Sequence, residues 1–196
     1  AGSLDVAAAN NLGGALQFTS IDPTDKFGVD VAGTVGSATT WRTFMRINSG
    51  KLPGGGKFYV SYNYQDADKW KGVGVQRQHQ ANAKFVQPIG ENVKLTVFGD
   101  WSQRRENDFQ DLSLSTIRSS GYRVDNITGN YSLAKQIGTA YQTGGAFPKG
   151  IPNQDYVYYN AAGLRQDAMG YGKLDFNLSS RLKGSITGYG HTNSGE

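Results

Sequence analysis

The sequence predicts an all-β protein, an antiparallel up-and-down β-barrel of the transmembrane kind, of which about seven strands are present. Three observations carry this prediction. Glycine (27 of 196 residues) and tyrosine (11) are abundant, and such a composition favours strands and turns over helices. Several segments alternate polar and apolar residues with a period of two. Short and long connections also alternate along the chain, as they do in outer-membrane barrels.

Composition also narrows the classes of partner. The mean hydropathy is −0.51, and no window reaches the roughly 18–20 apolar residues that a transmembrane helix needs. This composition is compatible with a membrane protein built from β-strands, because such strands expose only every second side chain to lipid. The net charge of +4 is scattered, so no basic stripe indicates a nucleic-acid partner. With no cysteine in the chain, disulfides and thiolate sites are excluded.

Seven strands are expected one after another, near the 9–11 residues with which a tilted strand crosses a bilayer. In the first, Val29, Val31 and Val35 share one face while Asp30 lies on the other. The fourth shows a weaker alternation than its neighbours. The alternation that marks these strands covers residues 27–35, 39–48, 57–65, 79–87, 92–102, 173–178 and 182–187.

The connections predict which end of each strand lies where. Tight turns are expected at 90–91 and 179–180, and a Gly/Pro-rich turn at 49–56. On the other side lie a longer connection at 66–76 and a very long loop at about 105–165. The first connection, near 36–38, breaks the pattern because it is short. The long loop shows little periodicity, so we expect no regular structure there, and an excursion of that length usually carries function.

Aromatic residues give a second indication. If the first strand runs outward, Trp41, Tyr64 and Trp101 all fall at the outer ends of their strands, on the apolar face. Interfacial aromatic girdles occupy that position in membrane barrels. Aromatic residues at the edge of a soluble sandwich would produce the same pattern, so that alternative stays open.

The segment before the first strand carries a resemblance to a known family. Gly13 and Gly14 precede a short apolar stretch at 15–18, and Asp22 and Pro23 then lead to the first strand. This order resembles the end of the plug domain of a TonB-dependent outer-membrane receptor. Paired glycines suit a tight bend packed against a barrel wall, where a Cβ would not fit. The simpler alternative is that the pair forms a turn between two strands.

The resemblance implies a division of the chain and a function. Residues 1–26 would be the end of the plug and its link, and 27–196 the first part of a barrel that has 22 strands in the family. Such receptors transport a scarce solute (siderophore-iron, cobalamin or an oligosaccharide) across the outer membrane of Gram-negative bacteria. Their partners are outer-membrane lipid, the solute and a periplasmic TonB-type energy-transducing complex, which acts through plug residues outside this chain. No enzyme activity and no cofactor are implied.

The resemblance also assigns roles to side chains. Asp30, Arg42 and Arg46 share the polar face, which in a receptor looks into the lumen and meets the plug; ordinary cross-strand ion pairing is the alternative. Aromatic residues of the long connections would stack on sugar or siderophore rings, although loop tyrosines also serve as simple packing. The candidates are Trp70, Tyr141, Tyr156, Tyr158 and Tyr159.

The remaining chemistry is sparse. His79 and His191 lie far apart in sequence without ligand-spaced partners, so no metal site is expected. The charged residues at 104–111 form a solvated cluster and indicate no catalytic pair. A secreted β-sandwich that binds carbohydrate is the alternative function, because the same alternation would face a protein core. An ordinary diffusion porin is disfavoured by the plug-like segment at 12–18.

Overall fold

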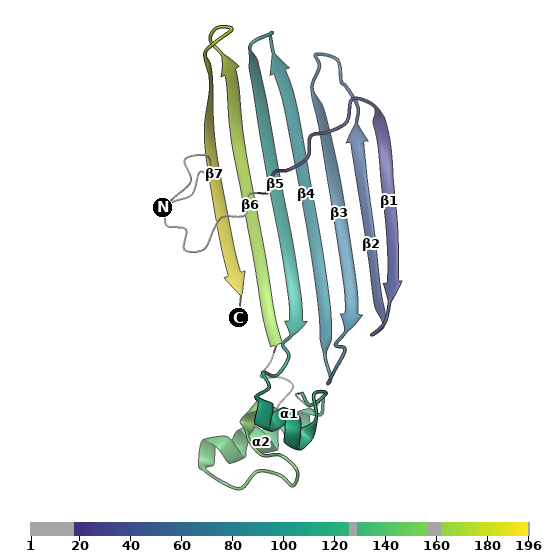
Figure 1. Ribbon diagram of the computed structural model, residues 1–196, viewed down its shortest axis with the longest axis vertical. Coiled ribbons are helices and arrows are strands. Elements are labelled where there is room, and N and C mark those ends of the chain that lie inside the picture. Colours follow the sequence, from purple (N-terminus) through teal and green to yellow (C-terminus); the bar gives the residue numbers. More distant parts are fainter. Residues whose placement is uncertain (1–17, 126–128, 157–161, 196) are drawn as a thin grey trace.

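The computed structural model describes residues 18–125, 129–156 and 162–195 (Figure 1). Its main element is a seven-stranded antiparallel sheet in which every strand pairs with its neighbours in sequence. This confirms the all-β, up-and-down prediction at the level of the sheet. Among the described residues β1 and β7 each pair with a single strand, so the sheet is open and its closure into a barrel stays a prediction. The strands are β1 (Phe27–Gly36), β2 (Thr40–Ser49), β3 (Lys57–Asp68), β4 (Val75–Ile89), β5 (Val93–Asn107), β6 (Ala162–Asn177) and β7 (Lys183–Gly195).

The register assigns the side chains to two faces. Val31, Met45, Tyr62, Ala81 and Trp101 lie opposite one another across the first five strands, in a row of one face. We call this side the apolar face. The opposite side, the polar face, carries the residues of the intervening rows, because successive side chains point to opposite sides of a strand.

Connections divide the sheet into two ends. The connections 50–56, 90–92 and 178–182 lie at the turn end, shown at the top of Figure 1. The connections 37–39 and 69–74 and the described residues of the connection 108–161 lie at the opposite end, which we call the helical end. It carries α1 (Leu114–Ser120), α2 (Tyr131–Thr143) and the short 3₁₀ helix η1 (Gln154–Tyr156).

The prediction of no regular structure in the long loop was wrong. Ser113 begins α1 by accepting a hydrogen bond from the Thr116 amide, and Asn130 does the same for the Leu133 amide at the start of α2. Such caps satisfy amides that have no partner inside the helix. Gly144 ends α2 in the left-handed conformation at φ 66°. No helix in the described part of the chain has the length and apolar character to span a membrane.

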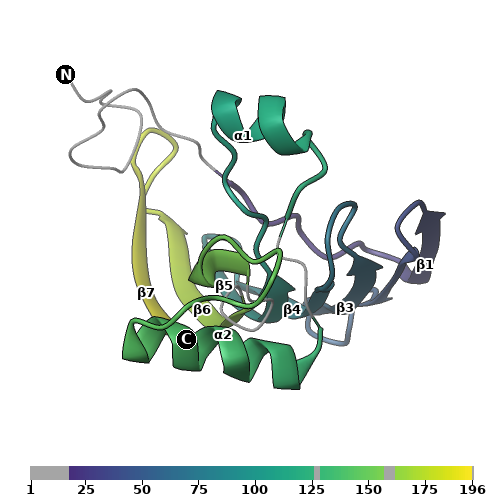
Figure 2. The ribbon, with the colours of Figure 1, turned by 90° about the horizontal axis from the view of Figure 1, so that it is seen from below.

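The helical end has a small apolar core of its own. Ala134, Ile137 and Ile151 are buried together, and partly buried Leu133, Phe147 and Tyr156 pack against them. The apolar positions of α2 thus face a local cluster. Figure 2 shows α1 toward the concave side of the sheet and α2 toward the other side.

The strands are longer than expected at the helical end. β4 begins at Val75, β5 continues to Asn107 and β6 begins at Ala162. Side-chain alternation is weak in these extensions, yet the backbone ladder continues through Asn107 and Ala162. The ladder needs only backbone amides and carbonyls, which explains why the sequence pattern stops short of the true strand ends.

Candidate functional site

The polar face is covered by the chain that precedes β1. Residues 18–26 run along the concave side of the curved sheet (Figure 2). Beneath them Arg46 is 9%, Lys84 5% and Asn48 2% exposed, and Pro23 of the covering segment is fully buried. Charged side chains are rarely this buried unless they are paired, so the contacts of these residues define the site.

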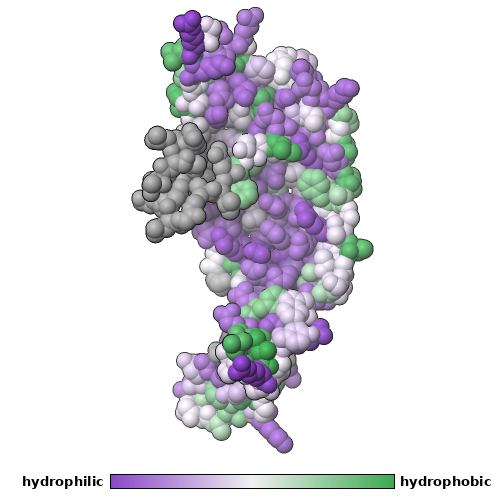
Figure 3. All heavy atoms as spheres, viewed as in Figure 1, coloured by the Kyte–Doolittle hydropathy of each residue, from purple (hydrophilic) through white to green (hydrophobic). Residues whose placement is uncertain are grey.

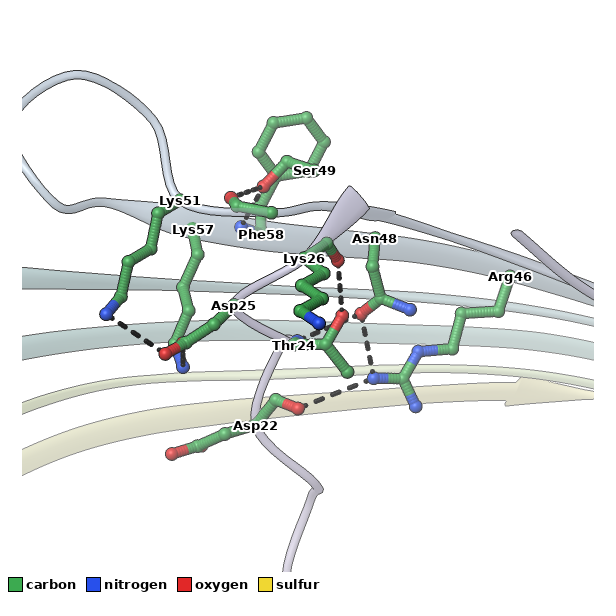
Figure 4. A network of polar contacts seen from close by, with 11 residues as sticks. Asp22, Thr24, Asp25, Lys26, Arg46, Asn48, Ser49, Lys51, Lys57 and Phe58 are labelled. Carbon is green, nitrogen blue, oxygen red and sulfur yellow. Dashed lines mark hydrogen bonds and ion pairs between the residues drawn. The ribbon is translucent and has the colours of Figure 1, made fainter. Parts of the chain in front are cut away.

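Asp22 is the centre of these contacts. The Nζ atom of Lys84 lies 2.6 Å from its carboxylate Oδ1 and also donates to the Ser20 carbonyl at 2.9 Å. Arg46 donates from Nη2 to the Asp22 carbonyl at 3.4 Å (Figure 4). Two cations, Arg46 of β2 and Lys84 of β4, therefore hold one short piece of the covering segment.

Asn48 joins the same network. Its Oδ1 accepts hydrogen bonds from the Thr24 amide at 3.2 Å and from Arg46 Nη2 at 3.1 Å (Figure 4). The Arg46 guanidinium carbon lies 4.2 Å from the centre of the Tyr59 ring, in the range of a cation–π contact. Arg46 is thereby fixed from the sheet side as well as from the segment side.

The ends of the segment have separate attachments. Asp25 pairs with Lys51 at 3.0 Å and with Lys57 at 2.8 Å (Figure 4). At the other end the hydroxyls of Ser20 and Tyr171 lie 2.6 Å apart. Contacts thus extend from the β2–β3 turn to β6, across most of the polar face.

These pairings lower the pKa of two carboxyl groups. The pKa of Asp22 lies below its ordinary range, chiefly because Lys84 donates to it, and burial opposes this effect only in part. The pKa of Asp25 is lowered by the hydrogen bonds from Lys57 and Lys51. A carboxyl group with a lowered pKa in the folded state stabilises that state fully above its ordinary pKa.

Acid is therefore expected to release the segment. The contribution of Asp22 is complete above about pH 3.9 and is lost as the pH falls through its lowered pKa. Asp22→Asn should cause the same release at neutral pH, measured as faster hydrogen exchange of amides 20–22 and 24–26 after correction for intrinsic rates. Asp30→Asn, at an exposed position of β1, is the control and should leave this exchange unchanged. Equal protection in Asp22→Asn and the unchanged protein would contradict the assignment.

The apolar face is exposed in the described structure. Val31 is 76% exposed, and no described segment lies over it as residues 18–26 lie over the polar face. Seen from the polar side, the middle of the sheet is predominantly hydrophilic (Figure 3). Burial is therefore reversed relative to a soluble sheet, which buries its apolar side. The exposed apolar residues of this face include Val29, Val31, Val35, Met45, Phe58, Val60, Tyr62, Val97 and Ile186.

The predicted girdle residues all lie on this face. Trp41 and Tyr64 form an edge contact with ring centres 5.1 Å apart, and His79 lies 4.6 Å from Tyr64. Trp101 lies in the row of Ala81 and Ala168, nearer the turn end of the register than Tyr64. Trp41, Tyr64 and Trp101 therefore lie in three successive rows of this face, one residue in each row.

The predicted lumen residues have different partners. Arg46 contacts the covering segment, as described above. Arg42 instead donates from Nε to Asn63 Oδ1 at 2.7 Å, within the sheet. Asp30 lies opposite Arg46 in the register, but no ion pair joins it to any residue of the described ranges.

The predicted solute contacts do not form one cluster. Trp70 is 53% exposed and lies beside Phe109 at 5.9 Å and Tyr122 at 6.5 Å between ring centres. Tyr141 is exposed on α2, whereas Tyr156 packs on the small core of the helical end. Tyr158 and Tyr159 lie outside the described residues, and so do Gly13 and Gly14.

A buried ion pair positions the Trp70 cluster. The side chains of Lys69 and Asp125 are fully buried, with Nζ 2.6 Å from Oδ2. Lys69 also donates to the Asp108 carbonyl, and the Gln110 amide donates to Asp125. Gly72, at φ +69°, allows this approach, because a Cβ there would lie 2.5 Å from the Asp125 carboxylate. The pair joins the β3–β4 connection to the β5–β6 connection.

Sequence reasoning missed Lys84, Asn48, Lys69 and Asp125. Lys84 belongs to the strand with the weakest alternation, and nothing local links residue 69 to residue 125. The sequence held a partial signal for the Trp70 cluster (Trp70, Phe109 and Tyr122), since Phe109 and Tyr122 flank charged loop residues in the same connection.

Comparison with known proteins adds no family. The chain matches no protein-family model, no curated protein and no solved structure at a significant level. Among the described residues there is no group of three or more histidine, aspartate or glutamate side chains that could hold a metal ion.

Proposed function

We propose that this chain is part of the wall of an outer-membrane transporter of the TonB-dependent receptor type. The supporting observation is the reversed burial of the sheet, in which buried Arg46 and Lys84 lie on the covered face while Val31 and its neighbours are exposed. Such an arrangement is unfavourable in water, where a contiguous exposed apolar surface marks an interaction site. It is the arrangement that a strand-built membrane wall requires, with lipid outside and a polar interior.

In this proposal the covering segment is the link between plug and barrel. Residues 18–26 lie on the side that would face the lumen, where Lys84 and Arg46 hold Asp22. The open edges of β1 and β7 would leave backbone groups unpaired in lipid, which costs several kcal/mol per group. Further strands would complete the wall.

The helical end would then face outward and receive the solute. Trp70, Phe109 and Tyr122 provide exposed rings held in place by the buried Lys69–Asp125 pair. Rings of this kind stack on the planar or sugar groups of a small solute. Energy would come from a periplasmic TonB-type complex acting on the plug, and no covalent chemistry is required.

Transport is tested in a Gram-negative host with and without the gene. We expect the protein in the outer-membrane fraction, extracted only by detergent, and accumulation of one of three radiolabelled probes: a ferric siderophore, cobalamin or a maltodextrin. A protonophore should abolish this accumulation, and Trp70→Ala should lower it about tenfold, the loss expected for one stacked aromatic ring. Recovery as a soluble protein without detergent would refute the proposal in favour of a secreted carbohydrate-binding sandwich.

A further inference from the structure

The apolar face changes character at its helical end. Arg77 of β4 and Arg105 of β5 lie directly opposite each other in the register. Both belong to the row of Trp41, and therefore to the apolar face. They line an open depression of about 720 Å³ together with His79, Gln103, Gln166 and Ser194, and Arg104 and Arg165 also border it.

Like charges directly opposite each other destabilise a strand pair. Arg77 is balanced on one side, because its Nε donates to Asp66 at 2.6 Å. Arg105 is exposed, and within the described ranges no carboxylate pairs with it. The depression therefore keeps an excess positive charge.

The second arginine pair beside the depression, Arg104 and Arg165, adds no such excess. Arg104 of β5 lies opposite Arg165 of β6. Because Arg104 is the neighbour of Arg105 in the strand, its side chain lies on the polar face. Arg104 pairs with Glu106 at 3.0 Å and Arg165 with Asp167 at 2.9 Å. Each arginine of the polar-face pair thus has its own carboxylate, whereas Arg105 on the apolar face has none among the described residues.

The surroundings of the depression indicate an amphiphilic ligand. Leu164, opposite Arg105 in the register, is exposed. Toward the turn end the same face continues through Tyr64 and Tyr62 to the exposed valines described above. A ligand that fits both the arginines and the exposed apolar residues has an anionic group at the arginines and apolar chains along the sheet. Arginine binds phosphate oxygens in a bidentate manner.

We propose that this depression binds the phosphate group of a membrane lipid whose acyl chains lie along the apolar face. The inference rests on the proposed function only in that the apolar face meets lipid. The arginines then mark the depth at which hydrocarbon gives way to headgroups. A lipid held there is a specific ligand of the wall, separate from the solute at the Trp70 cluster.

Lipid binding is tested on the protein purified in a neutral detergent, with native mass spectrometry as the readout. The probe is phosphatidic acid; phosphatidylcholine tests the need for an exposed phosphate, and inorganic phosphate tests the need for acyl chains. Arg105→Gln and Arg77→Gln should each weaken phosphatidic acid binding about tenfold, the loss of a charge-assisted contact. Arg118→Gln removes an exposed cation from α1 at the same end and should bind as the unchanged protein does.

Three results would overturn the inference. They are equal binding by Arg105→Gln and Arg118→Gln, equal affinity for phosphatidylcholine, and full competition by inorganic phosphate at the concentration of the lipid. Because Arg105 is exposed, its replacement leaves no cavity, and unchanged heat-modifiable electrophoretic mobility verifies the fold of each variant. Failure of the lipid test in protein that still requires detergent leaves the transporter proposal intact. Protein that is soluble without detergent refutes the transporter proposal itself.

Discussion

Val31→Arg is expected to reduce strongly the amount of folded protein in the outer membrane. Val31 lies in the middle of β1 on the apolar face and is 76% exposed. If this face meets lipid, an arginine near the bilayer midplane costs about 2–4 kcal/mol. In an aqueous protein the same exposed substitution would change the free energy of unfolding by only about 0.5 kcal/mol. The measurement is the heat-modifiable fraction of the protein in isolated outer membranes.

The neighbouring residue supplies the matched control. Ala32 is also exposed on β1, but it lies on the polar face, opposite Phe44. Ala32→Arg adds the same side chain to the same strand and should assemble at nearly the normal level. Equal assembly of the two variants would mean that the exposed face does not meet lipid, and the proposed topology would be wrong.

Asp125→Ala is expected to disorder the connection that carries the ring cluster. Its removal leaves the fully buried Lys69 ammonium without a counter-charge, and such a loss costs about 3–5 kcal/mol. Amides 107–125 should lose their protection in native-state hydrogen exchange, and the accumulation of solute should fall. The strands should keep their protection, because their ladders do not depend on this pair.

Two further variants separate charge from packing. Replacing both partners, Lys69→Met with Asp125→Ala, should restore part of the protection, because no uncompensated charge stays buried. Asp111→Ala removes an exposed carboxylate from the same connection and should have little effect. Similar loss in Asp111→Ala and Asp125→Ala would show that the buried pair has no special role.

The sequence predicted the sheet well because its signal is local. A period of two over a few residues is enough to place Val29, Val31 and Met45 on one side, and tight turns then order the strands. The strand ends at Asn107 and Ala162 were missed because backbone pairing continues where side-chain alternation stops. The helices were missed although Ser113 and Asn130 are cap residues in the sequence.

The candidate site was less accessible to sequence reasoning. Arg46 was selected because its place on the polar face could be read from its own strand. Its partners Asp22 and Asn48, and the second cation Lys84, depend on how residues 18–26 cross the sheet. The pairing of Lys69 with Asp125 joins two connections that are far apart in the chain, and no local pattern encodes such a contact.

The attachment of residues 18–26 has a mechanical consequence. Tension applied to the chain before Phe18 reaches Ser20 first, then Asp22, and then Thr24 and Asp25, because these attached residues follow one another along the segment. The segment therefore peels from the sheet in steps, each resisted by a few contacts. Beyond Asp25, whose carbonyl accepts from the Lys51 amide at 3.0 Å, the chain enters β1, which is paired with β2 along its whole length. Many backbone hydrogen bonds then resist together, so we expect a pull that detaches the segment to leave the sheet intact.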